Sequence, residues 1–461
     1  MASVHFLHHV CVGIVLISLG HSAKYDPNWD SLDSRPLPDW YDDAKLGMFI
    51  NWGVYTVPSF ADEWFWYRWK GPSGEVNPAI VKYMKENYPP GFTYQDFAAQ
   101  LKLEFYNPKR WMKTILKSGV KYIVLSTKHH EGFTMYPSKY SFNWNAMDVG
   151  PKKDLIGEMA KAINGSGIHF GLYHSLFEWF NPIFLKDQEN KYTTQDFVFG
   201  KTLPELYEIV ENYKPDVVWS DGHWMAPSGY WNSSTFIAWL YNESPVKDTV
   251  VTNDRWGSDT MCKHGGFLTC HDRYNPGVLQ KRKWENAMTL DRQSWGFRRD
   301  ASLEDFFTIE QLLKTIITTV SCGGNILMNV GPTPAGIFSP IYEERFTQLG
   351  SWLDVNGPAI YKTKPWTYQN DTLTKDIWYT QSKATPAVVY GFFLEWPKEP
   401  FLLFGAPKST RFTTVQLLGY SPTLQWEDHP HGGMIVSIPP IPHSQMPCSW
   451  AWALAFSYLD N

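Results

Sequence analysis

The sequence has little net charge and no surplus of basic residues. Charged residues make up 19% of its 461 residues, and the formal net charge is −5. Because a polyanionic partner favours clustered Lys and Arg, we predict no nucleic-acid partner. Long hydrophobic runs are also missing after the first 23 residues. We therefore expect a soluble mature protein that does not enter a membrane.

Several catalytic signatures are absent as well. The sequence has no G-x-S-x-G elbow, no P-loop, no dinucleotide-binding fingerprint and no H-E-x-x-H zinc motif. A zinc site could be imagined from His129, His130, His174 and Asp221. However, neighbouring residues on a strand point to opposite faces, so His129 and His130 should not share one metal ion. We predict no metal and no cofactor.

The N-terminus has the pattern of a secretory signal. Val10 to Leu19 is apolar and is followed by small residues, although the segment before it contains His and no Lys or Arg. The run is too short to span a bilayer, so we expect cleavage near Ala23. Residues 1–23 are therefore predicted to be a signal peptide, and the mature protein to be lysosomal or extracellular.

Cysteines are few. Cys11 leaves with the signal, and the four that remain allow three full pairings. Cys262 and Cys270 are close enough in sequence to join one loop, whereas Cys322 also fits a free buried thiol. The secretory route makes four sequons candidate glycosylation sites: Asn164, Asn232, Asn242 and Asn370. Pro245, just after the third sequon, should reduce its use.

Aromatic residues are abundant, at 16% of the chain with 23 Trp. Aromatic side chains wall sugar-binding sites, because the C–H faces of a sugar ring pack on π faces. They also fill large hydrophobic cores, and composition alone does not separate the two uses.

Seven short apolar runs are predicted to be buried parallel strands. They are Leu46–Gly53, Val120–His130, Ile168–Ser175, Asp216–Gly222, Thr249–Gly257, Lys283–Met288 and Asn325–Gly331. Helical patterns lie between them at Asp154–Asn164, Thr202–Tyr213 and Ile309–Val320, the second with a capping box of Thr202 and Glu205. This alternation predicts a (β/α)8-like barrel whose eighth strand is not located, with a doubly wound open sheet as the alternative.

After about residue 360 the pattern changes to strands broken by Pro, Gly and Ser. The runs are Ala387–Pro397, Thr413–Tyr420, Gly433–Pro440 and Ser449–Leu459. They predict an antiparallel β-sandwich that follows a linker at Asn356–Trp366. The expected domains are thus a catalytic barrel over residues 24–360 and a β-sandwich over residues 361–461.

Polar residues follow the predicted strands, at the rim where barrels carry their active sites. They are Asn51 and Trp52; His129, His130 and Glu131; Tyr173 and His174; Trp219 and Asp221; Asp254 and Arg255; and Glu285. Two carboxylates flanking a glycosidic bond suffice for sugar hydrolysis. Asp221 suits the role of nucleophile or water-directing base, and Asp272 and Glu285 compete for the acid/base role.

Six motifs resemble animal α-L-fucosidases of glycoside hydrolase family 29. They are WYDDAKLGMFINWGVYTVPSFADEWFWYRW, KYIVLSTKHHEGF, GLYHSLFEW, DVVWSDG, VVTNDRWG and SWGFRRD, and the likeness runs from about Tyr25 to near the C-terminus. The resemblance implies a (β/α)8-like domain with a C-terminal β-sandwich. It also implies a retaining, metal-free release of terminal α-L-fucose from the fucosylated glycans of glycoproteins or glycolipids, and it is compatible with a homo-oligomer.

The resemblance also assigns roles to residues. Asp221 is implied to be the nucleophile and Asp272 the acid/base, with Glu285 as the alternative. The implied fucose-binding residues are Asn51, Glu63, Trp64, His129, His130, Tyr173, Trp219, Arg255 and Trp295. Two positions depart from the family pattern, since Asn51 replaces a His and His223 replaces a Glu. They keep open a second hypothesis, a secreted fucose-binding homologue with weak or no turnover.

Overall fold

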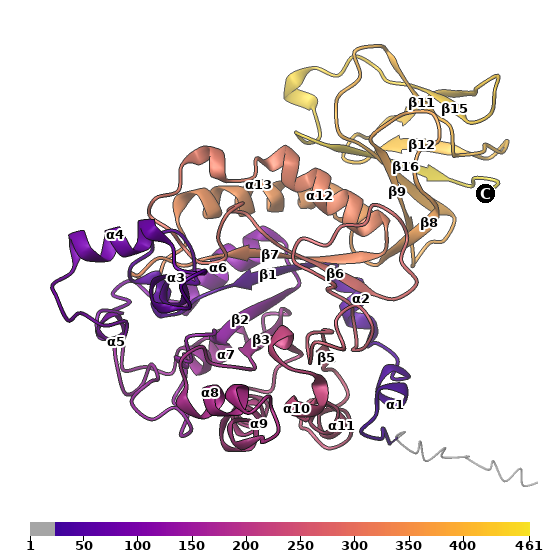
Figure 1. The fold of residues 1–461 in the computed structure, drawn as a ribbon. Helices are drawn as coiled ribbons and strands as arrows, with labels where there is room; N and C mark the ends of the chain where they lie inside the picture. Colours follow the sequence, from indigo (N-terminus) through magenta and orange to yellow (C-terminus); the bar gives the residue numbers. More distant parts are fainter. Residues whose placement is uncertain (1–23) are drawn as a thin grey trace, which may run out of the picture.

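The structure, a computed structural model, describes residues 24–461. The predicted signal peptide lies outside the described residues. In the part that is described, a larger β/α domain precedes an antiparallel β domain, which lies beside α12 and α13 (Figure 1). None of the helices in this part is long and apolar enough to cross a bilayer.

The larger domain is built on parallel strands that curl into a half-barrel. Across residues 24–461 this sheet has seven strands in the order β5-β4-β3-β2-β1-β7-β6. The strands are β1 (Leu46–Ile50), β2 (Tyr122–Lys128), β3 (His169–Ser175), β4 (Val217–Asp221), β5 (Val251–Thr252), β6 (Trp284–Thr289) and β7 (Gly324–Val330). Each lies within or one residue beyond a predicted run, because short β-branched and aromatic segments are what a sheet covered on both faces selects.

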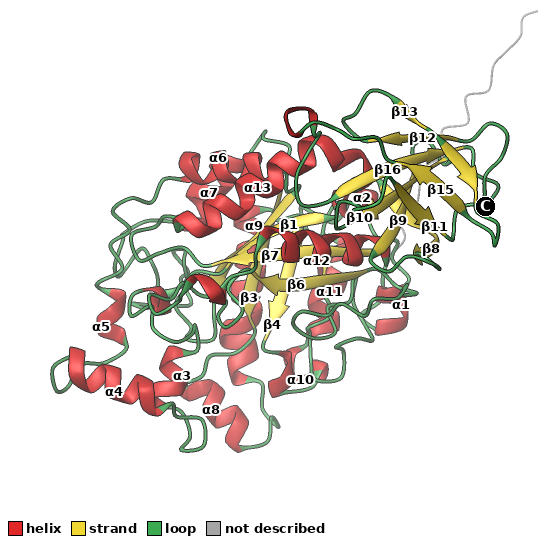
Figure 2. Ribbon diagram, turned by 90° about the horizontal axis from the view of Figure 1, so that it is seen from above, coloured by secondary structure: helices red, strands yellow, loops and turns green. Residues whose placement is uncertain are grey.

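Helices surround this sheet (Figure 2). They are α1 (Trp29–Asp33), α2 (Asp39–Ala44), α3 (Phe65–Lys70), α4 (Pro78–Asn87), α5 (Gln95–Ala98), α6 (Pro108–Ser118), α7 (Leu155–Ile163), α8 (Pro182–Glu189), α9 (Leu203–Tyr213), α10 (Ser228–Trp231), α11 (Ser233–Asn242), α12 (Ile309–Ser321) and α13 (Pro340–Asn356). Some lie over the outer face of the sheet and others, such as α3, α4 and α5, lie to one side of it (Figure 2). Single-turn or π-helical segments are η1 (Val54–Thr56), η2 (Val198–Thr202), η3 (His223–Met225), η4 (Leu303–Asp305), η5 (Gly357–Ala359) and η6 (His443–Gln445).

The eighth strand that the sequence pattern did not locate corresponds to a short bridge between the two sheet edges. The Phe267 amide donates to the Thr252 carbonyl of β5 over 3.0 Å, and Leu268 exchanges backbone bonds of 2.9 and 2.8 Å with Lys283 and Glu285. This segment follows two glycines and makes an isolated parallel bridge with Trp284. The predicted barrel-like class is therefore confirmed. The segment in the place of the eighth strand is too short to appear as an apolar run in the sequence.

The predicted capping box at Thr202 and Glu205 is wrong. The π-helical turn η2 runs directly into α9, and Thr202 has helical backbone angles and makes no side-chain cap. Its hydroxyl donates instead to the Leu176 carbonyl over 2.8 Å. Glu205 is buried and accepts from Lys128 over 2.6 Å and from Lys201 over 2.8 Å, because a fully buried carboxylate needs charged partners.

The C-terminal domain consists of two antiparallel sheets. In the described part of the chain, six strands pair in the order β13-β12-β16-β10-β9-β8 and three in the order β11-β15-β14. Their bounds are β8 (Thr363–Asn370), β9 (Ile377–Ser382), β10 (Val388–Phe393), β11 (Phe401–Phe404), β12 (Thr414–Leu417), β13 (Thr423–Leu424), β14 (Trp426–Asp428), β15 (Met434–Ser437) and β16 (Trp452–Ser457). Strand β8 begins inside the predicted linker, and the boundary at residue 360 stays a prediction.

Hydrophobic packing joins and fills both domains. Beneath the rim of the half-barrel, Tyr41, Phe49, Tyr122 and Trp219 belong to one buried cluster. The six-stranded sheet packs on α13 through Phe392, whose ring lies 6.3 Å from that of Trp352, and the Trp352 indole donates to the Ala451 carbonyl over 2.8 Å. Because all parallel strands end at the same rim, this packing holds their C-terminal residues in fixed positions around one mouth.

Candidate active site

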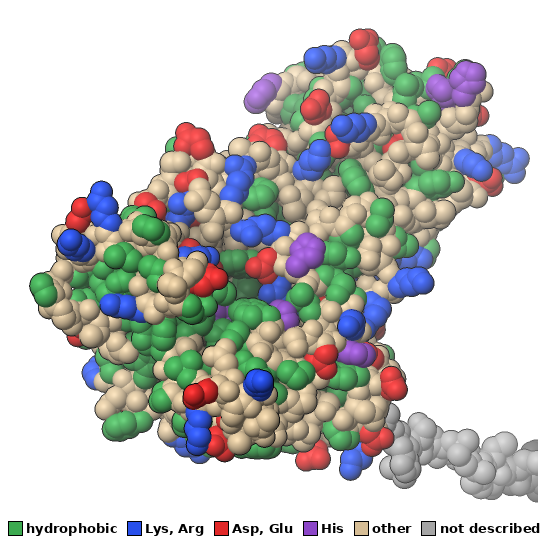
Figure 3. Space-filling view, viewed as in Figure 1, with side chains coloured by type: hydrophobic (Ala, Val, Ile, Leu, Met, Phe, Trp, Pro, Cys, Tyr) green, Lys and Arg blue, Asp and Glu red, His purple; other side chains and the backbone are tan. Residues whose placement is uncertain are grey.

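A cavity of about 320 Å³ opens at the C-terminal ends of the parallel strands. It is lined by Phe49, Asn51, Glu63, Trp64, His129, His130, Tyr173, Trp219, Asp221, Trp224, Arg255, Asp272 and Trp295. Figure 3 shows a hollow near the centre of one face, bordered by hydrophobic, acidic, basic and histidine side chains. Its volume is near the lower end of the range for ligand pockets and suits a single small ring.

Of the polar residues predicted at the strand ends, the structure leaves Trp52, Glu131, His174, Asp254 and Glu285 outside the cavity lining. The eleven other predicted catalytic and binding residues line the cavity, whereas Glu285 does not. Sequence reasoning missed Phe49 and Trp224. Phe49 lies inside β1, one residue before the strand end, and its ring packs against Tyr173 and Trp219 at 5.5 and 5.4 Å between centroids.

Asp221 is the last residue of β4 and lies deep in the cavity. Its Oδ2 accepts from the Tyr173 hydroxyl over 2.9 Å, and its Oδ1 accepts from Arg255 Nη1 over 3.2 Å. His130 Nε2 lies 3.5 Å from Oδ2. Burial opposes ionisation, but the hydrogen bond from His130 and the charge of Arg255 outweigh it and hold the pKa of Asp221 below its usual range. Asp221 is therefore held in its carboxylate form.

The histidine beside Asp221 is neutral near pH 7. Burial lowers the pKa of His130 to about 3, aided by the neighbouring His129, despite the opposing effect of Asp221. Its Nδ1 lies 2.6 Å from the Ser175 hydroxyl, which orients the ring. His130 thus acts on Asp221 as a polar ring, and Arg255 supplies the fixed positive charge.

One guanidinium holds both candidate catalytic carboxylates. Arg255 Nη1 binds Asp221, and Nη2 donates to Asp272 Oδ1 over 2.6 Å. The two acids differ in exposure, since the side chain of Asp221 is 12% exposed and that of Asp272 is 42% exposed. Asp221 therefore marks the closed end of the cavity and Asp272 marks its mouth, and Arg255 binds both.

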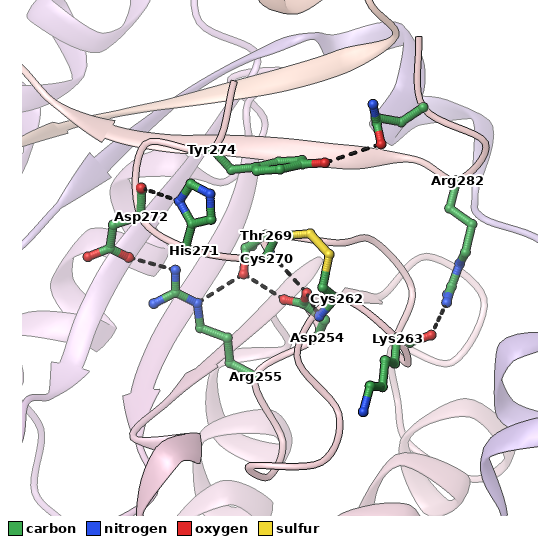
Figure 4. Close-up of a disulfide and its surroundings, with 11 residues drawn as sticks. Asp254, Arg255, Cys262, Lys263, Thr269, Cys270, His271, Asp272, Tyr274 and Arg282 are labelled. Carbon is green, nitrogen blue, oxygen red and sulfur yellow. Dashed lines mark hydrogen bonds and ion pairs between the residues drawn. A yellow bond between two sulfur atoms is a disulfide. The ribbon is translucent and has the colours of Figure 1, made fainter. Parts of the chain in front are cut away.

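The loop that carries Asp272 is fixed by a disulfide and by a second aspartate (Figure 4). Cys262 and Cys270 are bonded, as their spacing suggested. Asp254 accepts from the Cys262 amide over 2.7 Å, from the Cys270 amide over 3.1 Å and from the Thr269 hydroxyl over 2.6 Å. The Thr269 oxygen in turn accepts from Arg255 Nε over 2.9 Å, so loop and guanidinium are positioned together.

Glu285 lies beneath the cavity floor. It is fully buried and accepts from the hydroxyls of Tyr41 and Tyr122 over 2.7 and 2.6 Å and from the Trp219 indole over 2.9 Å. Burial raises its pKa against the effect of these three donors. The Arg255 guanidinium lies over the Trp219 ring, 4.7 Å from the ring centroid. The position of Glu285 suits support of Trp219 rather than contact with a ligand.

His129 and His130 both face the cavity, contrary to the expectation that neighbours point to opposite faces. The reason is that β2 ends at Lys128, after a register shift between Ser126 and Lys128. Both histidines therefore lie in the loop that follows. Over residues 24–461 no group of three or more His, Cys, Asp and Glu side chains is arranged to hold a metal ion.

Glu63 and Asn51 form a polar wall of the cavity, and only some of their hydrogen-bonding atoms have partners. Glu63 Oε2 accepts from the Trp295 amide and the Ser294 hydroxyl over 2.9 and 3.0 Å, while Oε1 has no partner among the described residues. Asn51 Oδ1 accepts from the Tyr55 hydroxyl. The side-chain amide nitrogen of Asn51 donates to no group among the described residues, so it stays available as a donor.

His223 follows the turn after Asp221 and stays outside the cavity lining. Its Nδ1 is buried, lacks a hydrogen-bond partner among residues 24–461 and lies 3.9 Å from Asp221 Oδ1. Burial and the charge of Arg255 lower the pKa of His223 to about 4. The departure from the family pattern at this position therefore places a neutral ring beside the buried carboxylate at neutral pH.

The four candidate glycosylation sites differ in accessibility. Asn164 and Asn370 are exposed, whereas the Asn242 amide both donates to the Tyr25 carbonyl and accepts from the Tyr25 amide, each over 2.8 Å. We expect glycan at Asn164 and Asn370 and little or none at Asn242. Peptide mapping after enzymatic deglycosylation in ¹⁸O water, which marks each formerly glycosylated Asn, measures this. Full occupancy of Asn242 would contradict the expectation.

The fold and the acid-and-aromatic cavity at the strand ends define a glycoside hydrolase. A family model described as Alpha-L-fucosidase matches residues 16–358, and one described as Alpha-L-fucosidase C-terminal domain matches residues 369–457. The chain belongs to the α-L-fucosidase family, and it is an enzyme of that family, a glycosidase.

Similar proteins cover nearly the whole chain. An alpha-L-fucosidase of Branchiostoma floridae is 56% identical over 95% of this chain and 97% of its own length. The plasma alpha-L-fucosidase of Homo sapiens is 54% identical over 95% and 93%, and the human tissue alpha-L-fucosidase 47% identical over 94% and 91%. The crystal structure of Thermotoga maritima alpha-fucosidase in complex with fucose is 29% identical, with a TM-score of 0.79, and covers 94% of this chain and 100% of that chain.

Proposed function

We propose that this enzyme is a retaining exo-glycosidase that releases terminal α-L-fucose, with Asp221 as nucleophile and Asp272 as acid/base. The observation that carries the proposal is that Arg255 holds both carboxylates, one buried and one half exposed. Retaining glycosidases need two carboxyl groups about 5–5.5 Å apart. A shared guanidinium is well suited to maintain such a short separation.

In the first step, a carboxylate oxygen of Asp221 attacks the anomeric carbon, and the bond from that carbon to the leaving oxygen breaks. Asp272 gives its proton to the leaving oxygen. The product is a fucosyl ester on Asp221. In the second step Asp272 takes a proton from water, the water oxygen bonds to the anomeric carbon, and Asp221 leaves as a carboxylate. The sugar is released with its original anomeric configuration.

The cavity suits the fucose ring itself. Partners for its hydroxyls are Glu63 Oε1, the side-chain amide of Asn51 and His129, all of which line the cavity and are buried. Aromatic surface for its apolar face and methyl group comes from Phe49, Trp219 and Trp295. A volume of about 320 Å³ suits one sugar ring, and the buried side chains of Asn51, Glu63 and His129 close one end of the cavity, which supports an exo mode of action.

Fucosylated glycans of glycoproteins and glycolipids are the proposed substrates, in the lysosome or outside the cell. The similar proteins are named plasma and tissue alpha-L-fucosidases, which supports a secretory route. The predicted signal and the disulfide agree with that route.

The stereochemistry of the released sugar tests the proposed mechanism. We expect proton NMR of a rapid digest of an aryl α-L-fucoside to show α-L-fucose first, with the β anomer growing only by mutarotation. An initial β signal would mean inversion and would overturn the nucleophile role of Asp221. Absence of turnover would favour the fucose-binding hypothesis.

Replacement of Asn51 tests the unusual residue of the polar wall. A His can form a charge-assisted hydrogen bond to a fucose hydroxyl, whereas the Asn51 amide forms a neutral one and its oxygen is already used by Tyr55. We expect Asn51→His to raise kcat/KM by about tenfold, equivalent to ~1.4 kcal/mol. Steady-state kinetics on one aryl fucoside measures the change. A fall in kcat/KM would show that the cavity has adapted to Asn51.

A further inference from the structure

Trp224 belongs to the cavity but has no part in the proposed chemistry. It lies in η3, directly after β4 and the turn at Gly222. Gly222 has φ +86°, and a Cβ there would lie 2.5 Å from the Phe177 ring. Only glycine fits this turn without strain, and the turn brings Trp224 back over the strand end that carries Asp221.

Exposure shows where the cavity opens. The side chain of Asp221 is 12% exposed, and Asn51, Glu63 and His129 are buried. Trp224 is 40% exposed, and the side chain of Asp272 is 42% exposed. These two are the only cavity-lining residues, in the part of the chain that is described, that count as exposed. Together they mark the mouth.

Neighbouring rings hold Trp224 in place. The rings of His130 and Phe177 lie at 84° and 78° to the Trp224 ring, and their centroids are 5.3 and 5.7 Å from its centroid. Trp64 lies nearly parallel to it, at 6.0 Å and 20°. An aromatic ring fixed on several sides and open on another binds a partner with little loss of side-chain entropy.

From this placement we infer that Trp224 is the platform for the first sugar of the leaving group, a pyranose that packs a C–H face on the indole. The inference rests on the proposed function. Asp272 must reach the leaving oxygen, so the sugar attached to that oxygen lies at the mouth, where Trp224 is exposed. A pyranose such as galactose or N-acetylglucosamine offers the apolar face that an uncharged aromatic surface recognises.

The test compares two substrates that share fucose but differ in the leaving group. One is α-L-fucosyl fluoride, which has no leaving sugar. The other is a disaccharide of α-L-fucose with galactose or N-acetylglucosamine. We expect Trp224→Ala to lower the ratio of kcat/KM for the disaccharide to kcat/KM for the fluoride by about 3- to 10-fold, the size of a typical aromatic contact. Trp224→Phe should restore most of the ratio.

Trp69 on α3 provides a matched control, because it is a partly exposed Trp that does not line the cavity. Trp69→Ala should leave the ratio unchanged. If Trp224→Ala lowers kcat/KM equally on both substrates, or on neither, the inference is overturned. Trp224 would then only shape the cavity. Failure of the wild-type enzyme to turn over either substrate would instead overturn the proposed function.

Discussion

Asp221→Gly should fold normally and lose roughly 10⁴- to 10⁶-fold in kcat, the range seen when a covalent nucleophile is removed. Asp221 is the group that forms the proposed ester, and the remaining cavity residues can only bind and orient. Added azide should restore part of the turnover, because a small anion can occupy the vacated space and attack the anomeric carbon. The measurements are kcat on an activated aryl fucoside, with and without azide, and thermal unfolding.

Asp216 provides a matched control for Asp221. It directly precedes β4, at the other end of the strand, and its carboxylate pairs with His169 over 2.9 Å. Asp216→Asn should keep near-normal kcat, since Asp216 lies outside the cavity lining and its contact with His169 is partly exposed. Near-normal activity in Asp221→Asn would be incompatible with its assignment as nucleophile.

Replacement of Asp272 should produce a loss that depends on the leaving group. General acid catalysis contributes about 10²- to 10⁴-fold, so Asp272→Ala should lose activity on that scale with natural disaccharides. With an aryl fucoside whose leaving group needs no proton, the first step should be much less impaired. Azide should then accelerate release of the sugar from the ester, because an anion needs no base. The readout is kcat/KM on both substrates.

Glu285 is the comparison that separates the two candidate acids. Because it lies beneath Trp219 and binds three donors, Glu285→Gln should lower kcat/KM on both substrates by the same factor and show no azide rescue. A buried donor that loses its acceptor costs about 1–3 kcal/mol, so thermal unfolding should shift as well. If Glu285→Gln shows the leaving-group split and Asp272→Ala does not, the two roles are reversed.

The sequence predicted the strands and most of the cavity for one physical reason. Buried parallel strands are short apolar runs, and all their C-terminal ends meet at one rim, so the polar residues that follow them converge. Asp221, Tyr173 and Arg255 are of this kind. The remote residues Glu63 and Trp295 lie in loops, and only the family resemblance indicated them.

The features that sequence reasoning missed depend on tertiary contacts. The segment at Phe267 and Leu268 acts as an eighth strand through a few backbone bonds to its neighbours, and no periodicity reveals so short a bridge. Thr202 has the residue type of a helix cap, but the preceding π-helical turn continues the helix through it. Trp224 could have been found from its place two residues after the Gly222 turn, at a strand end in a chain rich in Trp.

The competition between Glu285 and Asp272 could not be decided from residue order. Asp272 lies in a loop, where an Asp is normally a solvated charge, and Glu285 lies within an apolar strand, where a Glu is rarer. Residue type therefore kept Glu285 as a competitor of Asp272. Burial separates them, because Glu285 points to the interior of the half-barrel and Asp272 to its mouth.

Covalent trapping tests the central claim most directly. A 2-deoxy-2-fluoro fucosyl fluoride has a good leaving group, and its fluorine destabilises the positively charged transition state, so the ester forms but is released slowly. We predict that intact-mass measurement shows one added 2-fluorofucosyl group per chain, and that peptide mapping places it on Asp221 in the segment DVVWSDGHW. A label on Asp272 or Glu285, or inactivation without any label, would contradict the account.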